Sequence, residues 1–299
     1  MKIVKFKGGL GNQMFQYAFL RLLQIKYNEQ EIKGDFFYYK ETGSDIIRQP
    51  RLLEMNVQLE LCSEEELKKI LLFKRIGSPL KFRYKIGVLL EWLFNSKYYF
   101  EQNRTYRNID KIIHYQYFDG YWQNWKYLSE IETELRSEFT QKEELSSLSK
   151  EKIDYVSKHN TVFVGVRRGD YLSSKKMIEI YGETDIEYYK KAMAYMCDKL
   201  ENPLFMFFSN DLEWVKENMT VAKLGLNGKC HIEYSEDVYS DLEELYVMGN
   251  CRHAIISNST FNYWGAWLID NKEKIVIAPK EWFKDGTEID IVPDTWIKM

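Results

Sequence analysis

Several residue types are scarce in this sequence, and their scarcity excludes whole classes of protein. Only 4 cysteines occur among 299 residues, and their scattered spacing argues against both a zinc cluster and a disulfide framework. No apolar run approaches the roughly 20 residues that a membrane span needs. The net charge of −3 supplies no overall attraction for nucleic acid or an anionic membrane, so any anion site must be local. We expect free thiols in a reducing, cytoplasmic protein without a signal peptide.

The overall composition is that of a globular protein. Hydrophobic residues make up 45% of the chain and charged residues 29%, which is enough for a sizeable core. The length suits two medium domains or one large α/β domain, and we place a boundary in the serine-rich stretch 145–150, giving domains 1–150 and 151–299. Aromatic residues reach 16%, which serves either packing or the stacking of sugars and bases.

The second half of the chain alternates short apolar strands with helices. The strands are expected at residues 162–166, 204–208, 231–234, 254–256 and 274–278. This alternation predicts an α/β fold with a doubly wound parallel sheet and helices on both faces.

The first of these strands ends abruptly in Arg167-Arg168-Gly169-Asp170. Guanidinium groups are seldom buried without a partner, and ligands bind at the carboxyl ends of parallel strands. Because arginine forks match phosphate oxygens, the pattern favours two fixed cations facing an anionic ligand. A strand end closed by a surface Arg–Asp pair is the alternative that this stretch leaves open.

Two more polar clusters follow strands of the same predicted sheet. They are Ser209-Asn210-Asp211 and Ser257-Asn258-Ser259-Thr260, and the second precedes a helix whose N-terminal amides attract phosphate. Strand ends of one parallel sheet share an edge, so the three clusters should converge on a pyrophosphate site, with Asp211 able to accept hydrogen bonds from a base or a ribose. Taken alone, the serine cluster is more typical of an ordinary helix cap than of a ligand site.

The first strand of the chain, near residues 3–6, leads into a glycine-rich loop. The loop is Lys7-Gly8-Gly9-Leu10-Gly11-Asn12, and a helix is expected from Gln13 with Asn12 as its N-cap. Such a layout presents backbone N–H groups to a ligand, although it matches neither the P-loop nor the dinucleotide fingerprint. A tight turn is the alternative.

Two further segments have two interpretations each. Residues 74–99 form a basic, aromatic stretch, which fits either a helix that contacts a membrane surface or a lipid-linked acceptor, or a solvated helix face; we favour the solvated face. The aromatic cluster at 118–125 is either a packing plug or one wall of a sugar-sized pocket.

Three blocks of sequence resemble one family. Residues 8–18, 167–171 and 257–267 are similar, in that order, to the α-1,2-fucosyltransferases of glycosyltransferase family 11. The resemblance implies a GT-B-like fold of two Rossmann-like domains, the N-terminal one on the acceptor side and the C-terminal one binding the donor. It also implies a GDP-fucose donor, an oligosaccharide acceptor with a terminal galactose, inversion at the anomeric carbon, and no cofactor or required metal. The absence of an Asp-x-Asp motif agrees with the last point.

The resemblance also implies roles for individual residues. Arg167 is similar to the arginine that binds the β-phosphate and stabilises departing GDP, and Arg168 to its helper or to a structural partner of Asp170. Asp170 is a candidate general base by its proximity in sequence, or a salt-bridge partner that orients Arg168. The remaining implied contacts are to donor phosphate (Ser257, Ser259, Thr260), to guanosine (Asn210, Asp211), and from the glycine loop to sugar and acceptor (Gly9, Gly11, Asn12, Gln13).

The chain departs from the family's pattern at two places. Gly165 stands where the family usually has histidine, and Asn262-Tyr263 stands where Ser-Trp is common. Neither departure removes a charged residue that is a candidate for catalysis, but both leave the identity of the donor sugar open. Three functions therefore stay in view: an α-1,2-fucosyltransferase of surface glycan synthesis, a transferase of another linkage or GDP-sugar, and a non-catalytic sugar or nucleotide binder.

Overall fold

The computed structural model describes residues 1–41, 49–73, 81–168, 175–182, 185–226, 228, 230–236 and 239–299. The chain divides into two compact units, which are described separately here. The first comprises Met1–Lys142 with Ile289–Ile291, and the second comprises Glu143–Glu288 with Val292–Met299. The chain passes between them before the serine-rich stretch, which belongs to the second unit.

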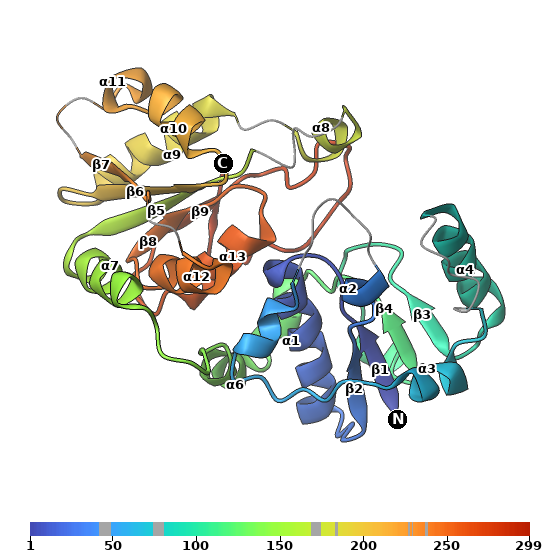
Figure 1. The fold of residues 1–299 in the computed structure, drawn as a ribbon. Helices are drawn as coiled ribbons and strands as arrows, with labels where there is room; N and C mark the ends of the chain where they lie inside the picture. Colours follow the sequence, from blue (N-terminus) through green and yellow to red (C-terminus); the bar gives the residue numbers. More distant parts are fainter. Residues whose placement is uncertain are drawn as a thin grey trace. The chain divides into compact units, whose positions relative to one another are not determined.

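The first unit is built on a four-stranded parallel sheet in the order β2-β1-β4-β3. Helix α1 packs on this sheet through an aromatic core, in which the Phe19 and Trp122 rings stack with centroids 3.7 Å apart. Helix α4 packs beside the edge strand β3 (Figure 1). The elements are β1 (Lys2–Lys5), α1 (Leu10–Lys26), β2 (Ile32–Asp35), α2 (Tyr38–Glu41), η1 (Arg51–Glu54), α3 (Glu64–Ile70), α4 (Lys81–Phe94), β3 (Tyr98–Phe100), η3 (Ile109–Lys111), β4 (Tyr117–Asp119), α5 (Trp125–Ser129) and α6 (Glu132–Glu138).

Helix α1 begins earlier than the sequence predicts. Its first residue is Leu10 and its N-cap is Gly9, so the expected cap at Asn12 is wrong. The reason is the turn at Gly8, whose φ of +87° is a conformation that favours glycine and turns the chain into the helix three residues sooner. Asn12 lies inside the helix, where its Oδ1 accepts a hydrogen bond from Gln123 Nε2 at 2.8 Å.

The second unit contains a six-stranded parallel sheet in the order β10-β9-β8-β5-β6-β7. Helices α9 and α10 lie on one side of this sheet, and α7, α12 and α13 on the other (Figure 1). The elements are α7 (Ser147–Lys158), β5 (Thr161–Val166), α8 (Lys175–Tyr181), α9 (Ile186–Lys199), β6 (Leu204–Ser209), α10 (Leu212–Asn218), α11 (Val221–Leu224), β7 (His231–Tyr234), α12 (Asp241–Gly249), β8 (His253–Ile255), α13 (Thr260–Leu268), β9 (Val276–Ala278) and β10 (Ile297–Lys298).

This strand order confirms the predicted doubly wound sheet. The chain moves from β5 outward to β6 and β7, then returns to the other side of β5 with β8 and continues outward. The order reverses between β5 and β8, which is where such sheets bind ligands. Prediction missed β10, which pairs with β9 at the C-terminal end of the chain and is too short to show a pattern in sequence. Among the described residues, no helix is both long and apolar enough to cross a membrane.

A buried ion cluster holds the carboxyl end of β4 in the first unit. The Asp119 carboxylate accepts hydrogen bonds from Lys5 Nζ at 2.7 Å, from Lys7 Nζ at 2.5 Å and from the Tyr98 hydroxyl at 2.7 Å. Burial by itself raises the pKa of Asp119, but the two ammonium groups outweigh it and hold the pKa well below its usual range. The cluster therefore ties β1, β3 and β4 together.

We expect Asp119→Asn to lower the free energy of unfolding by about 3 kcal/mol, because it leaves two buried ammonium groups without their counter-charge. The depressed pKa means that this stabilisation is present above the unfolded pKa of about 4 and is lost as the pH falls. Urea unfolding at pH 7 and at pH 3 measures both effects, and the gap between variant and wild type should shrink at pH 3.

The matched control is Asp154→Asn, which removes an exposed pair with Lys158 on α7. An exposed pair of this kind contributes at most about 0.5 kcal/mol. Equal stability of the Asp119→Asn protein and the control at pH 7 would contradict the assignment.

Candidate functional site

The three polar clusters predicted from sequence follow adjacent strands. Strand β5 pairs with β6 on one side, Val166 opposite Ser209, and with β8 on the other, Val164 opposite Ile255. The residues after these strands therefore lie along one edge of the sheet, at the point where the strand order reverses. This is the placement that the sequence predicts, and the ligand contacts of these residues stay a prediction.

Arg168 is a buried cation that the start of α10 holds in place. Its guanidinium carbon lies 3.5 Å from the centroid of the Trp214 ring, and its Nε lies 3.4 Å from Asp211 Oδ2. Its backbone N–H donates to Asn210 Oδ1 at 3.0 Å. Stacking and pairing together fix the guanidinium, which offsets the cost of burying it. Trp214 was not recognised from sequence, because its spacing fits an ordinary helix residue.

Asp211 and Asn210 therefore also stabilise the structure at this edge of the sheet. Asp211 is the N-cap of α10, and its Oδ1 accepts from the Trp214 N–H at 3.3 Å. Its side chain is nevertheless 38% exposed. One oxygen caps the helix and the other pairs with Arg168, so a guanosine contact would have to be shared with both.

Arg167 follows β5 directly and is half-buried. The positive charge of Arg167 acts on the carboxyl group of Glu244, which lies in the first turn of α12. Burial raises the pKa of Glu244 to about 7, the Asp241 carboxylate adds to the shift, and the positive charge of Arg167 opposes it. Sequence analysis missed Glu244 because acidic residues in a first helical turn are an ordinary N-terminal preference. Asp170, the other candidate carboxylate, lies outside the described residues.

The serine cluster caps α13 and packs against the end of β5. Ser259 is the N-cap, and its Oγ accepts from the Asn262 N–H at 3.5 Å. Asn262 Nδ2 donates to Ser257 Oγ at 3.2 Å, and both side chains are buried. Thr260 is the first residue of the helix.

Gly165 and Asn262 form one structural feature. A Cβ atom placed on Gly165 would lie only 1.8 Å from Asn262 Nδ2, so the amide occupies the space beside the bare backbone of β5. The two departures from the family's pattern that the sequence showed separately are therefore coupled. A histidine at position 165 does not fit while Asn262 holds this position.

The glycine loop belongs to the first unit. Gln13 is fully buried, donates from Nε2 to Gln49 O at 2.9 Å and accepts from the Leu52 N–H at 3.0 Å. Gly11 is also buried, while Gly9 serves as the cap of α1. The Asn12 and Gln13 side chains thus anchor the loop to neighbouring segments, and their predicted approach to sugar and acceptor is not tested by this geometry.

Within the described ranges, no group of three or more His, Cys, Asp or Glu side chains could hold a metal ion. The residues at the β5–β8 edge are cationic, amide and hydroxyl groups, which suit phosphate oxygens.

Comparison with known proteins decides the family. Glycosyl transferase family 11 matches the chain over residues 1–299. The chain belongs to glycosyl transferase family 11. The resemblance inferred from three short blocks is thereby confirmed. The strand pairing separately confirms the α/β fold with a parallel sheet in each of two units.

Of three relatives, one is named for colitose, one for fucose and one for no particular sugar. The chain is 29% identical to the Escherichia coli O-antigen biosynthesis glycosyltransferase WbnK, with 98% of each chain covered. It is 28% identical to an alpha-1,2-colitosyltransferase of E. coli, with 99% of this chain and 98% of the relative covered. It is also 28% identical to galactoside alpha-(1,2)-fucosyltransferase 1 of Plecturocebus brunneus, over 50% of this chain and 42% of the relative.

The contact between Gly165 and Asn262 makes a testable prediction. Gly165→Ala should lower the free energy of unfolding by about 2 kcal/mol, because the added methyl group overpacks a buried site. Asn262→Ala alone should cost about 1 kcal/mol for its lost hydrogen bond. In the double variant the methyl group takes the vacated space, so the combined loss should fall below the sum by at least about 1 kcal/mol. Urea unfolding of the four proteins measures the difference.

Gly87→Ala is the control. A Cβ at Gly87, inside α4, would approach no closer than 3.7 Å to the Phe73 oxygen. That substitution should not destabilise the protein. Additive losses in the Gly165→Ala/Asn262→Ala protein would show that the two positions are independent.

Proposed function

We propose that this family 11 glycosyltransferase is an inverting enzyme that moves L-fucose from GDP-β-L-fucose to a galactoside hydroxyl in α-1,2 linkage. The observation that carries the proposal is the pair Arg167-Arg168 at the end of β5, beside the serine-capped start of α13. Both lie where the strand order reverses, and both suit a pyrophosphate. We further propose a cytoplasmic enzyme of surface glycan synthesis that needs no metal and uses an oligosaccharide acceptor with a terminal galactose.

The proposed reaction assigns each arginine a separate task. The acceptor hydroxyl oxygen attacks the anomeric carbon from the face opposite GDP, and the bond from that carbon to the β-phosphate oxygen breaks. The hydroxyl proton passes to a general base, for which Asp170 stays the candidate from the sequence. Negative charge grows on the β-phosphate, where Arg167 stabilises the transition state more than the ground state. Arg168, fixed by Trp214 and Asp211, supplies a second cation that needs no reorganisation during the reaction.

Glu244 tunes the charge that faces the donor. Its pKa of about 7 keeps the carboxyl group largely protonated below neutral pH, which leaves the charge of Arg167 available to the pyrophosphate. When Glu244 ionises, it opposes that charge. We therefore propose that the ionisation of Glu244 modulates the positive charge that Arg167 presents to the donor.

A second candidate donor follows from the packing of Gly165 against Asn262. The Asn262 amide fills the space beside Gly165 at the end of β5, where the resemblance leads us to expect a histidine. One relative is named a colitosyltransferase, so we keep GDP-linked colitose as the alternative donor. A panel of GDP-linked sugars at equal concentration distinguishes the two donors.

Arg167→Ala should reduce transfer at least about a hundredfold while leaving the fold intact, because it removes the group that stabilises the leaving phosphate. The measurement is GDP release from GDP-fucose with and without lactose, in EDTA. Lactose-dependent release in the wild type, lost in the variant, is the expected result. The control is Arg136→Ala, which removes an exposed i,i+4 pair on α6 and should leave release unchanged.

Near-wild-type release by a folded Arg167→Ala protein would refute its assignment. Binding of GDP-fucose without release in the presence of lactose would retain the donor site and reject the galactoside acceptor. Binding without turnover on any acceptor would favour a non-catalytic binder.

The pH dependence of donor binding tests Glu244. As the pH rises from 6 to 8, Glu244 ionises, and GDP-fucose affinity should weaken by roughly tenfold, since one new negative charge faces the site. GDP-fucose has no phosphate group that titrates in this range, so calorimetry at both pH values reports the protein. Glu244→Gln should remove most of the change.

Glu243→Gln is the matched control on the same helix. The hydrogen bond from the Ser146 N–H lowers the pKa of Glu243, so that residue stays ionised throughout. Identical pH profiles for the wild type and the Glu244→Gln protein would reject the role of Glu244.

A further inference from the structure

Helix α4 of the first unit exposes an apolar face. The helical period places Ile86, Leu89, Trp92 and Leu93 on one side, and the exposed fractions of Leu89, Trp92 and Leu93 are 49%, 44% and 54%. Phe94 ends the helix and is 66% exposed. We call these five residues the α4 face. The sequence favoured a solvated helix face in this stretch, and the structure shows that most of the exposed side chains on this side are apolar.

Basic side chains lie on and beside the α4 face. Glu91 is the acidic residue of α4, and it points inward, where it accepts hydrogen bonds from the Phe73 N–H and from Asn95 Nδ2. Lys85 is exposed one turn before Leu89 on the same side of the helix. The helix therefore combines apolar and cationic groups on its surface while its carboxylate is buried.

Two further exposed lysines lie on segments tied to the end of α4. Asn95 Nδ2 donates to Ile70 O at 2.7 Å, which joins the last turn of α3, with Lys69, to the end of α4. Asn95 Oδ1 accepts from the Lys97 N–H at 3.0 Å. The acidic residues of α3, Glu64, Glu65 and Glu66, lie in its first turn, at the other end of the helix from Lys69.

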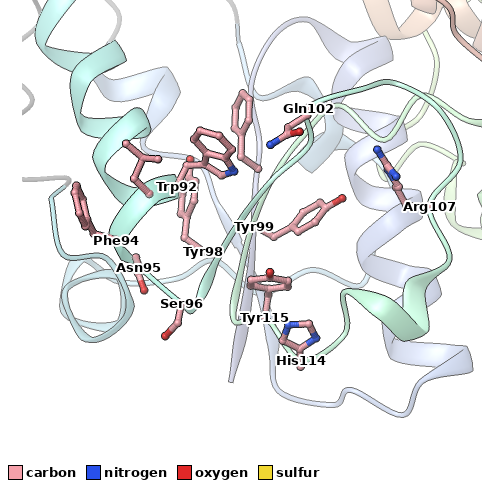
Figure 2. Close-up of a pocket in the computed structure, with 12 residues that line it drawn as sticks. Trp92, Phe94, Asn95, Ser96, Tyr98, Tyr99, Gln102, Arg107, His114 and Tyr115 are labelled. Atoms are coloured by element: carbon pink, nitrogen blue, oxygen red, sulfur yellow. The ribbon is translucent and has the colours of Figure 1, made fainter.

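A cavity of about 660 Å³ adjoins the α4 face. Trp92, Leu93 and Phe94 line it from the helix, and tyrosines, His114 and Arg107 line it from the opposite side (Figure 2). The rings of Tyr99 and Tyr115 lie 5.3 Å apart and those of His114 and Tyr115 4.1 Å apart. Aromatic rings with polar tips beside basic groups are characteristic of side chains that sit at the level of lipid headgroups.

We propose that the α4 face and the adjoining cavity dock the protein on a bilayer that contains anionic phospholipid. The apolar side chains would enter the headgroup–acyl boundary, the lysines would face phosphate, and the tyrosines, His114 and Arg107 would contact headgroups. A second copy of the chain is a poorer occupant, because a twofold interface would bring the same lysines toward each other. Docking of this kind would bring the enzyme to a lipid-linked acceptor.

The test is sedimentation of the full chain with phosphatidylcholine vesicles, with and without phosphatidylglycerol. The wild type should bind the anionic vesicles, and added salt should weaken the binding. Leu89→Glu combined with Leu93→Glu should reduce binding at least about tenfold, because it places two charges in the contact. Leu148→Glu is the control, since Leu148 is also an exposed helical leucine, at 40%, and lies in the other unit.

Both variant proteins should keep the wild-type thermal midpoint, because the substituted side chains are exposed. Absence of wild-type binding to anionic vesicles, or undiminished binding by the double variant, would overturn the proposal. A wild-type dimer by light scattering that the double variant dissociates, without vesicle binding, would assign the face to a second copy and overturn it too. The assay contains neither donor nor acceptor, so its outcome is independent of the proposed transfer reaction.

Discussion

The burial of a guanidinium group at the end of a buried strand is the constraint on which this edge of the second unit's sheet depends. Arg168 follows β5 at the centre of a parallel sheet, where a cation needs partners. Those partners come from the neighbouring strand connection: Trp214 stacks on the guanidinium, Asp211 pairs with it, and Asn210 fixes its backbone. These contacts hold the start of α10, and the adjacent edge of the sheet, in one position.

On the other side of the same sheet edge, side-chain contacts also fix the start of a helix, α13. Asn262 bonds to Ser257 and fills the space that Gly165 leaves open, so the end of β5 and the start of α13 pack as one block. Close packing of this kind means that neither position can change alone without strain.

The first unit is stabilised by a different kind of interaction. Its sheet is secured by the buried Lys5–Lys7–Asp119 cluster, while its peripheral helix α4 leaves apolar side chains in contact with solvent. Exposed apolar surface costs free energy, and this helix keeps it next to an aromatic cavity and local cations. The stable core and the exposed face thus lie in one small unit.

The sequence by itself determined what depends on near neighbours along the chain. The alternation of strands and helices predicted the doubly wound sheet, which the structure confirms. Motif blocks were enough to identify the family. Only the tertiary structure decided where α1 begins, because residue type alone does not determine the φ of Gly8. Tertiary structure also decided the stacking of Arg168 on Trp214, the electrostatic effect of Arg167 on Glu244, and the contact of Gly165 with Asn262. Each of these pairs is brought together by the order of the strands and not by a local sequence pattern.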